Sequence, residues 1–89
     1  TRAELRQVGR IRLVGWHCSY SLIINEWWLV RNAESGVLSL SNVGGDMYGE
    51  QGEVSYPLAE ARTCLTPNAF EKLVEIFGTD QIENFPSTL

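Results

Sequence analysis

The sequence predicts an α+β domain, with a small antiparallel β-sheet of about four to five strands and one principal C-terminal helix packed on one face of the sheet. Three observations carry this prediction. Short runs rich in β-branched and aromatic residues, separated by turn residues, occupy residues 10–65. One later stretch repeats its apolar residues at helical spacing. The chain has 89 residues, 44% of them hydrophobic, which suits a single domain over residues 1–89.

The first nine residues are expected to form either an N-terminal arm or a short helix (residues 1–9). Thr1 and Glu4 have the spacing of a capping box, in which two side chains satisfy the free N–H groups of a helix start. Gly9 would end such a helix quickly. Both alternatives lead directly into the first strand.

Residues 10–41 contain the clearest strand signals. Residues 10–19 begin by alternating arginine with apolar residues, as a strand with one wet face does. Residues 21–31, "SLIINEWWLVR", are the strongest strand of the chain because they are rich in branched and aromatic side chains. Residues 32–36, "NAESG", have the chemistry of a tight hairpin loop, and residues 37–41 return as its antiparallel partner. A β-hairpin over residues 21–41 follows.

A glycine-rich segment comes next. Residues 42–53 contain four glycines and three acidic residues, which favours a long loop or the extended tip of a hairpin. Residues 54–65 are expected to supply one or two shorter strands. Pro57 cannot donate a hydrogen bond to a central ladder, so this part of the chain belongs at an edge of the sheet or marks a break.

The principal helix is predicted over residues 66–78. Thr66 suits the N-cap, Pro67 suits the first helical position, and Gly78 would end the helix. The apolar residues at helical spacing, which form one stripe, are Phe70, Leu73, Val74 and Phe77. Residues 79–89 are expected to form a tail.

Two adjacent tryptophans, Trp27 and Trp28, raise a question about the strand that contains them. Successive residues of a strand point to opposite faces of a sheet, and both faces of this strand are mainly apolar. One helix covers only one face. The second face would be covered by the N-terminal segment, by closure of the sheet into a small barrel, or by another protein chain. A tryptophan buries on the order of 150–250 Å², so we predict a binding surface there, with burial inside the chain as the alternative.

The favoured function is therefore a non-enzymatic protein–protein interaction module, such as an adaptor, a small subunit, or an inhibitor or immunity-type protein, with a homodimer as one form of it. Tyr48 and Met47 would anchor the glycine-rich segment on the partner, and the acidic residues of that segment, Glu53 included, would steer a basic partner. The predicted partner-binding residues are Trp27, Trp28, Leu29, Arg31, Asp46, Met47, Tyr48 and Glu50.

Two other functions stay open. A small molecule would occupy a pocket between sheet and helix, lined by Trp16, Trp28 and Tyr56. Nucleic acid would contact the arginines of the N-terminal segment, because residues 1–31 carry five arginines against two glutamates. Residues 32–89 carry two basic against nine acidic side chains, and the net charge of −4 argues against a general nucleic-acid binder.

No pattern in the sequence indicates catalysis, a metal or a cofactor. His17 and Cys18 are adjacent and diverge on a strand, so they cannot form a nucleophile–base pair, and both Cys18 and Cys64 lie in apolar runs typical of core cysteines. Two cysteines and one histidine fall short of a zinc site. Glu26 is expected to pair with Arg12 or Arg31 across the strands rather than to act as a catalytic acid.

The sequence also bears on the compartment. Two cysteines allow one disulfide, but buried free thiols in a reducing compartment are favoured, which indicates a cytoplasmic protein. The apolar runs are only a few residues long, far fewer than the roughly 20 residues of a transmembrane helix. Neither a membrane span nor a signal peptide is expected.

Overall fold

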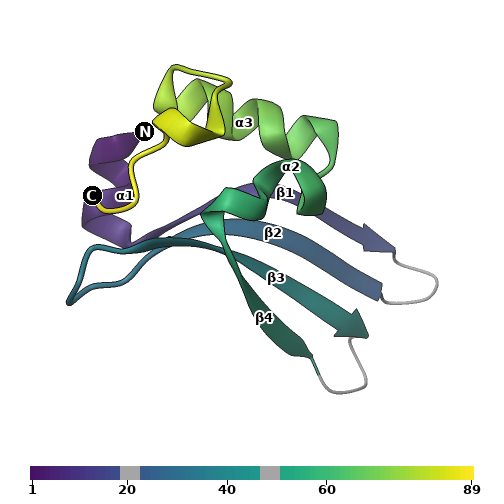
Figure 1. Cartoon of the computed structure of the whole chain (residues 1–89). Coiled ribbons are helices and arrows are strands. Elements are labelled where there is room, and N and C mark those ends of the chain that lie inside the picture. The colour runs from purple at the N-terminus through teal and green to yellow at the C-terminus, as the bar shows by residue number, and fades with distance from the viewer. Residues whose placement is uncertain (19–22, 47–50) are drawn as a thin grey trace.

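The computed structural model describes residues 1–18, 23–46 and 51–89 (Figure 1). Its four strands form one antiparallel sheet in the order β1-β2-β3-β4, and the helices gather over one face of it, so the predicted α+β fold is confirmed. The elements are α1 (Arg2–Val8), β1 (Arg10–Cys18), β2 (Ile23–Arg31), β3 (Leu38–Asp46), β4 (Gly52–Pro57), η1 (Leu58–Glu60), α2 (Ala61–Cys64), α3 (Pro67–Phe77) and η2 (Ile82–Asn84).

The first residues form the helix α1 rather than an extended arm. The Thr1 hydroxyl accepts a hydrogen bond from the Glu4 N–H at 3.2 Å, and Gly9, with φ of 88°, ends the helix in a left-handed conformation. Leu5 is fully buried and fixes the helix to the core. A helix of seven residues is too short to be stable alone, so this packing decides between the two alternatives.

The principal helix α3 lies where the sequence predicts it. The Thr66 hydroxyl accepts a hydrogen bond from the Ala69 N–H at 3.4 Å, and Gly78 ends the helix with φ of 75°. Leu73 and Phe77 are buried against the sheet. The residues expected to be a tail return to the sheet instead, because the Leu38 N–H donates to the Ser87 carbonyl at 3.0 Å.

The glycine-rich segment contains more strand than predicted. Residues 42–46 belong to β3 and residues 52–53 to β4, so a loop over the whole of 42–53 is wrong, and a hairpin with long arms is right. The reason is pairing on both sides: Val43 lies opposite Glu26 in β2 and opposite Glu53 in β4. Two ladders of hydrogen bonds hold the glycines in an extended conformation that glycine alone does not favour. Residues 47–50 lie outside the described part of the chain.

Residues 54–65 supply one strand rather than two. β4 ends at Pro57, and η1 and α2 follow. Pro57 lies on the edge strand, as its missing N–H predicts. The helical turns bring Leu58 and Ala61 into the core, where both are buried.

The core lies between the sheet and the helices. One row of paired residues crosses the sheet from Ile11 through Leu29 and Leu40 to Tyr56. Leu29 and Leu40 are fully buried, and Leu5 and Leu73 close the core from the helical side. Because directly paired residues share a face, this row identifies the side of the sheet that the helices cover, which we call the helix face. The opposite side is called the open face.

Candidate functional site

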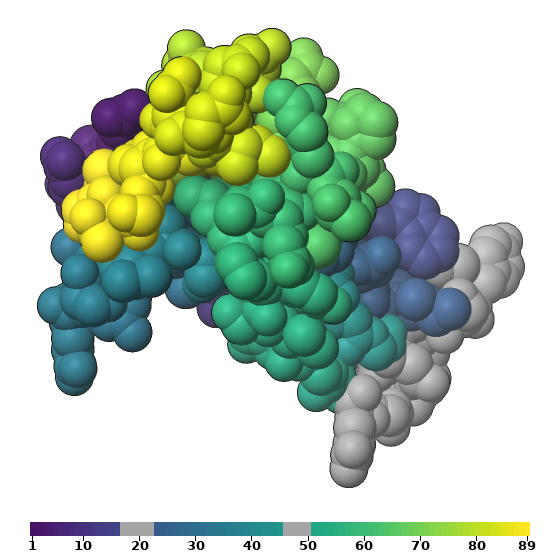
Figure 2. All heavy atoms as spheres, viewed as in Figure 1, coloured from purple at the N-terminus to yellow at the C-terminus, as the bar shows by residue number. Residues whose placement is uncertain are grey.

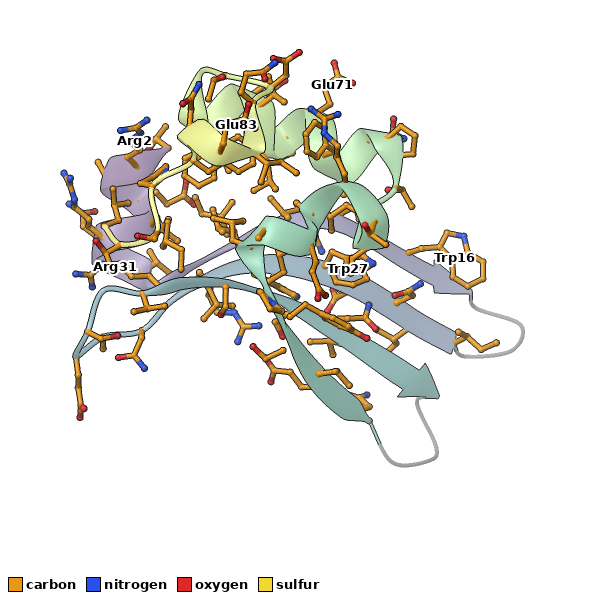
Figure 3. The ribbon with its side chains drawn as sticks, viewed as in Figure 1. Arg2, Trp16, Trp27, Arg31, Glu71 and Glu83 are labelled. Carbon is orange, nitrogen blue, oxygen red and sulfur yellow. The ribbon has the colours of Figure 1, made fainter. Side chains whose placement is uncertain are left out.

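The two adjacent tryptophans lie on opposite faces, as strand geometry requires. Trp27 shares the helix face with Leu29, and Trp28 points to the open face. Trp27 is half-buried, and its ring centroid lies 5.5 Å from that of Tyr56 at an interplanar angle of 44°. Figure 3 shows it on the helix side of the sheet. Trp27 is therefore a border residue of the core.

Trp28 is covered by a side chain of the neighbouring strand. The Arg10 guanidinium lies over the Trp28 ring at 4.3 Å from the ring centroid, the distance of a cation–π contact. Beside it, Arg12 Nη1 lies 3.7 Å from Glu26 Oε2, which confirms the predicted pairing of Glu26 with an arginine. No helix lies over this face among the described residues (Figure 1). The Arg10 guanidinium thus covers part of the Trp28 ring from the neighbouring strand.

The buried Trp28 indole leads to a specific prediction about the stability of Trp28 variants. Its Nε1 is buried and has no acceptor among the described residues, and a buried donor without a partner costs about 1–3 kcal/mol. Phenylalanine keeps an aromatic ring beneath Arg10 and removes that donor. We expect Trp28→Phe to leave the free energy of unfolding within about 1 kcal/mol of the parent and Trp28→Ala to lower it by about 2–3 kcal/mol, measured by urea unfolding. A loss of several kcal/mol for Trp28→Phe would show that the indole N–H is hydrogen-bonded.

Two of the predicted partner-binding residues have structural roles. Leu29 is 0% exposed in the core and cannot reach a partner, so its assignment to the binding surface is wrong. The prediction erred because the strand is apolar on both sides, and sequence alone does not say which side the helices cover. Arg31 is half-buried, and its Nε donates to the Leu89 carbonyl at 2.6 Å, so it holds the C-terminal segment against the sheet.

The predicted residues of the glycine-rich segment are not placed by the structure. Met47, Tyr48 and Glu50 lie outside the described residues, and so does the side chain of Asp46. Glu53 is described: it lies on β4, and its Oε1 accepts a hydrogen bond from the Ser41 hydroxyl at 2.5 Å. Of the acidic residues expected to steer a partner, Glu53 alone has a described side chain.

The most exposed tryptophan is one that sequence reasoning did not select for protein binding. Trp16 is 56% exposed, on β1. It pairs with Asn25, which shares the helix face with Trp27, yet it lies at the end of the strand beyond the helices (Figure 3). Two further exposed apolar residues share this face, namely Ile23 at 43% and Val54 at 51%. We call this surface the distal face and define it by Trp16, Ile23, Asn25, Asn42 and Val54.

A pair of amides lies within the distal face. Asn42 Nδ2 donates to Asn25 Oδ1 at 2.9 Å and to the Glu26 carbonyl at 3.2 Å. The next row along the sheet holds two residues without side chains, Gly44 and Gly52. A Cβ atom added at Gly52 would have open space around it. The distal face therefore combines exposed apolar side chains, a polar centre formed by the two amides, and a row of backbone at Gly44 and Gly52 that no side chain of its own covers.

The two alternative functions lose part of their basis. Trp16 and Trp28 lie on opposite faces of the sheet, so the predicted pocket lined by Trp16, Trp28 and Tyr56 does not form. Four of the five arginines in residues 1–31 are held by the protein itself, and Arg31 is the one that contacts Leu89. Arg2 Nη2 donates to the Phe77 carbonyl at 3.2 Å, while the Arg10 and Arg12 side chains contact Trp28 and Glu26 respectively.

Other chemistry is sparse in the described part of the chain. Cys64 carries a free thiol and is half-buried, with its Sγ 3.9 Å from Glu60 Oε2. The side chains of His17 and Cys18 lie outside the described residues. Within residues 1–18, 23–46 and 51–89, no three described His, Cys, Asp or Glu side chains gather in a way that could hold a metal. No described helix has both the length and the apolar character needed to cross a membrane.

No protein family model, curated protein or solved structure matches this chain. A function for the chain therefore has to be inferred from the distal face and its surroundings.

Proposed function

We propose that this protein is a non-enzymatic protein-binding module that docks a partner through the distal face. The observation that carries the proposal is the position of Trp16, Ile23 and Val54, which are all exposed on one side of the sheet beyond the helices. Trp16 and Ile23 occupy diagonal positions on neighbouring strands, and Val54 lies beyond the two asparagines on β4. Large groups of exposed apolar side chains on one face mark interaction sites. The sequence had placed this surface around Trp27 and Trp28, but both of those rings are half-buried by their own chain.

The exposed indole is large enough to dominate an interface. A fully buried tryptophan covers about 150–250 Å², and Trp16 leaves somewhat more than half of its surface uncovered. Covering about 100 Å² of apolar surface contributes roughly 2–3 kcal/mol at about 25 cal/mol per Å². That is the range of an interface hot spot, and tryptophan is among the residues most enriched at such positions. Asn25 and Asn42 supply polar groups within the same surface.

A basic partner fits the charge of the chain. The net charge is −4. Attraction between opposite charges raises the rate of association more than it raises affinity. Asp46 and Glu50 would add to this attraction. The free thiol of Cys64 supports a reducing compartment such as the cytoplasm.

Site-specific cross-linking tests the proposal even though the partner is unidentified. A photoreactive phenylalanine analogue is placed at position 16, and in a control protein at position 8 of α1, where Val8 is 66% exposed. In cells of the native host, position 16 should give one discrete cross-linked protein that position 8 does not give. Identical patterns from both positions, or no adduct at position 16, would contradict a docking role for the distal face.

Two exposed valines give a matched pair of variants for the captured partner. Val54 belongs to the distal face, whereas Val8 lies on α1, and both side chains are more than half exposed. We expect Val54→Ser to weaken partner binding about fivefold, which corresponds to about 1 kcal/mol, because it removes part of the apolar contact. Val8→Ser should leave affinity within twofold of the parent, by isothermal titration calorimetry. The proposal fails if the two variants bind equally well.

A further inference from the structure

A second surface, which adjoins the distal face at β4, lies between β4 with η1 and the C-terminal segment. Two adjoining hollows of about 430 and 190 Å³ share Leu58, Ala59 and Ser87 as lining residues. The larger hollow opens beside the end of β4, at Tyr56 and Pro57. The apolar residues that line the smaller one include Ile82, Phe85 and Pro86. Figure 2 shows this side of the molecule, with the C-terminal segment in yellow and η1 in green.

The hollows continue from an unpaired strand edge. β4 is the last strand of the sheet, and no described strand pairs with its outer side. Alternate residues of such an edge turn their N–H and C=O groups outward, where another strand can pair with them. The residues from Gly52 to Ser55 are all exposed. A chain that runs along this edge and passes Pro57 reaches the larger hollow.

The other edge of the sheet is protected, which distinguishes β4. On β1 the pairing shifts between Arg12 and Val14, so Leu13 forms a bulge, and Arg10 and Arg12 carry charge along the same strand. Bulges and positive charges are the usual means by which proteins prevent strand addition. β4 has neither a register shift nor a basic residue, and its one proline lies at the very end.

The charges around the hollows indicate what kind of segment would bind. Glu83 lines the smaller hollow, Glu60 directly follows Ala59, and Glu53 lies on β4. Neither hollow is lined by a lysine or an arginine among the described residues. The surroundings are thus apolar in the hollows and acidic along their borders.

We propose that the β4 edge binds an extended segment of another protein in which basic residues alternate with apolar ones. The backbone of that segment pairs with the outer side of β4, and its apolar side chains enter the two hollows. Its basic side chains turn to the opposite side of the added strand, on which the Glu53 side chain lies. In strand addition, main-chain hydrogen bonds provide affinity and pockets for alternate side chains provide specificity. This site adjoins the distal face, because Val54 belongs to β4, but it uses the outer edge of that strand and the two hollows rather than the surface around Trp16.

A model peptide tests the proposal. The probe is a blocked octapeptide in which lysine alternates with valine, added to ¹⁵N-labelled protein and followed by NMR. We expect amide shifts centred on residues 52–59 and 82–87. Methylating the backbone nitrogens on one side of the peptide should weaken binding at least tenfold, whereas methylating those on the other side should have little effect, because a strand pairs through one edge only. A peptide with glutamate in place of lysine should not bind.

A matched pair of variants separates this site from the distal face. Ala59 lines both hollows and is exposed, so Ala59→Phe fills them at little cost to folding and should weaken peptide binding at least tenfold. Trp16→Ala should bind the peptide like the parent. The proposal is overturned if the peptide fails to bind, if both methylated forms bind equally, if Ala59→Phe binds normally, or if light scattering shows the edge already occupied by further copies of this chain. If Trp16→Ala abolishes binding of the distal-face partner but not of the peptide, the conclusion about the β4 edge still stands.

Discussion

Replacing Leu29 by alanine should lower the free energy of unfolding by about 3–4 kcal/mol, among the largest effects expected of a single substitution in this protein. Leu29 is 0% exposed in the middle strand pair, within the row from Ile11 to Tyr56, and its removal leaves a cavity that the surrounding sheet cannot collapse to fill. A domain of this size has a total stability of roughly 4–13 kcal/mol, so this loss is a large part of it. Urea unfolding followed by tryptophan fluorescence measures the change.

The neighbouring residue Val30 is the matched control for this substitution. Val30 lies on the same strand but points to the open face and is half-buried, so Val30→Ala should cost only about 1 kcal/mol. A clearly larger loss at Leu29 than at Val30 supports the assignment of the helix face. Similar losses at both positions would mean that the open face is covered as fully as the core.

The second large effect concerns binding rather than folding. We expect Trp16→Ala to weaken binding of the cross-linked partner at least 30-fold, about 2 kcal/mol, because Trp16 is the largest exposed apolar side chain of the distal face. The same substitution should change the free energy of unfolding by less than about 0.5 kcal/mol, as is usual for surface positions. Isothermal titration calorimetry and urea unfolding measure the two quantities separately.

The opposite pattern would contradict the proposed role of Trp16. If Trp16→Ala destabilises the domain by several kcal/mol but leaves affinity unchanged, the indole is part of the fold and not of the interface. Trp16→Phe is a useful intermediate variant, since it keeps an aromatic ring and should retain much of the affinity. The expected order of affinity is therefore the parent, then Trp16→Phe, then Trp16→Ala.

Local signals in the sequence predicted most of the architecture. The hairpin over residues 21–41 has strong strand residues on both sides of a turn, and it forms β2 and β3. The helix over residues 66–78 has a cap, an apolar stripe and a terminal glycine, and it forms α3. Each of these elements depends on residues close together in the chain, so no tertiary information was needed.

The position of Trp16 could not be predicted from the sequence, for a specific reason. In a regular strand, Trp16 would lie on the same face as Arg10 and Arg12, which is the open face. The bulge at Leu13 adds one residue to β1, and every later residue of the strand turns to the opposite face. Trp16 consequently joins Ile23 and Val54. No single residue of the sequence predicts this change of face, since the bulge arises from pairing with β2.

The covering of Trp28 depends on register in the same way. The sequence showed that both faces of β2 are apolar, but the contact between Arg10 and Trp28 follows from the alignment of β1 with β2. The strands in the glycine-rich segment have a similar origin, because the ladders to β2 and β4 outweigh the local preference of glycine. Pairing between strands, rather than local sequence preference, thus explains each of these differences between prediction and structure.

The most direct test of the distal face as a docking surface is an NMR cross-saturation experiment on the complex with the cross-linked partner. The protein is deuterated and ¹⁵N-labelled, the partner is irradiated, and the loss of signal is mapped onto the amides of this chain. Docking through the distal face predicts the largest losses at Trp16, Ile23 and Val54, with the Trp16 indole N–H among them. Losses centred on Arg10, Trp28 and Val30, across the open face, would contradict it.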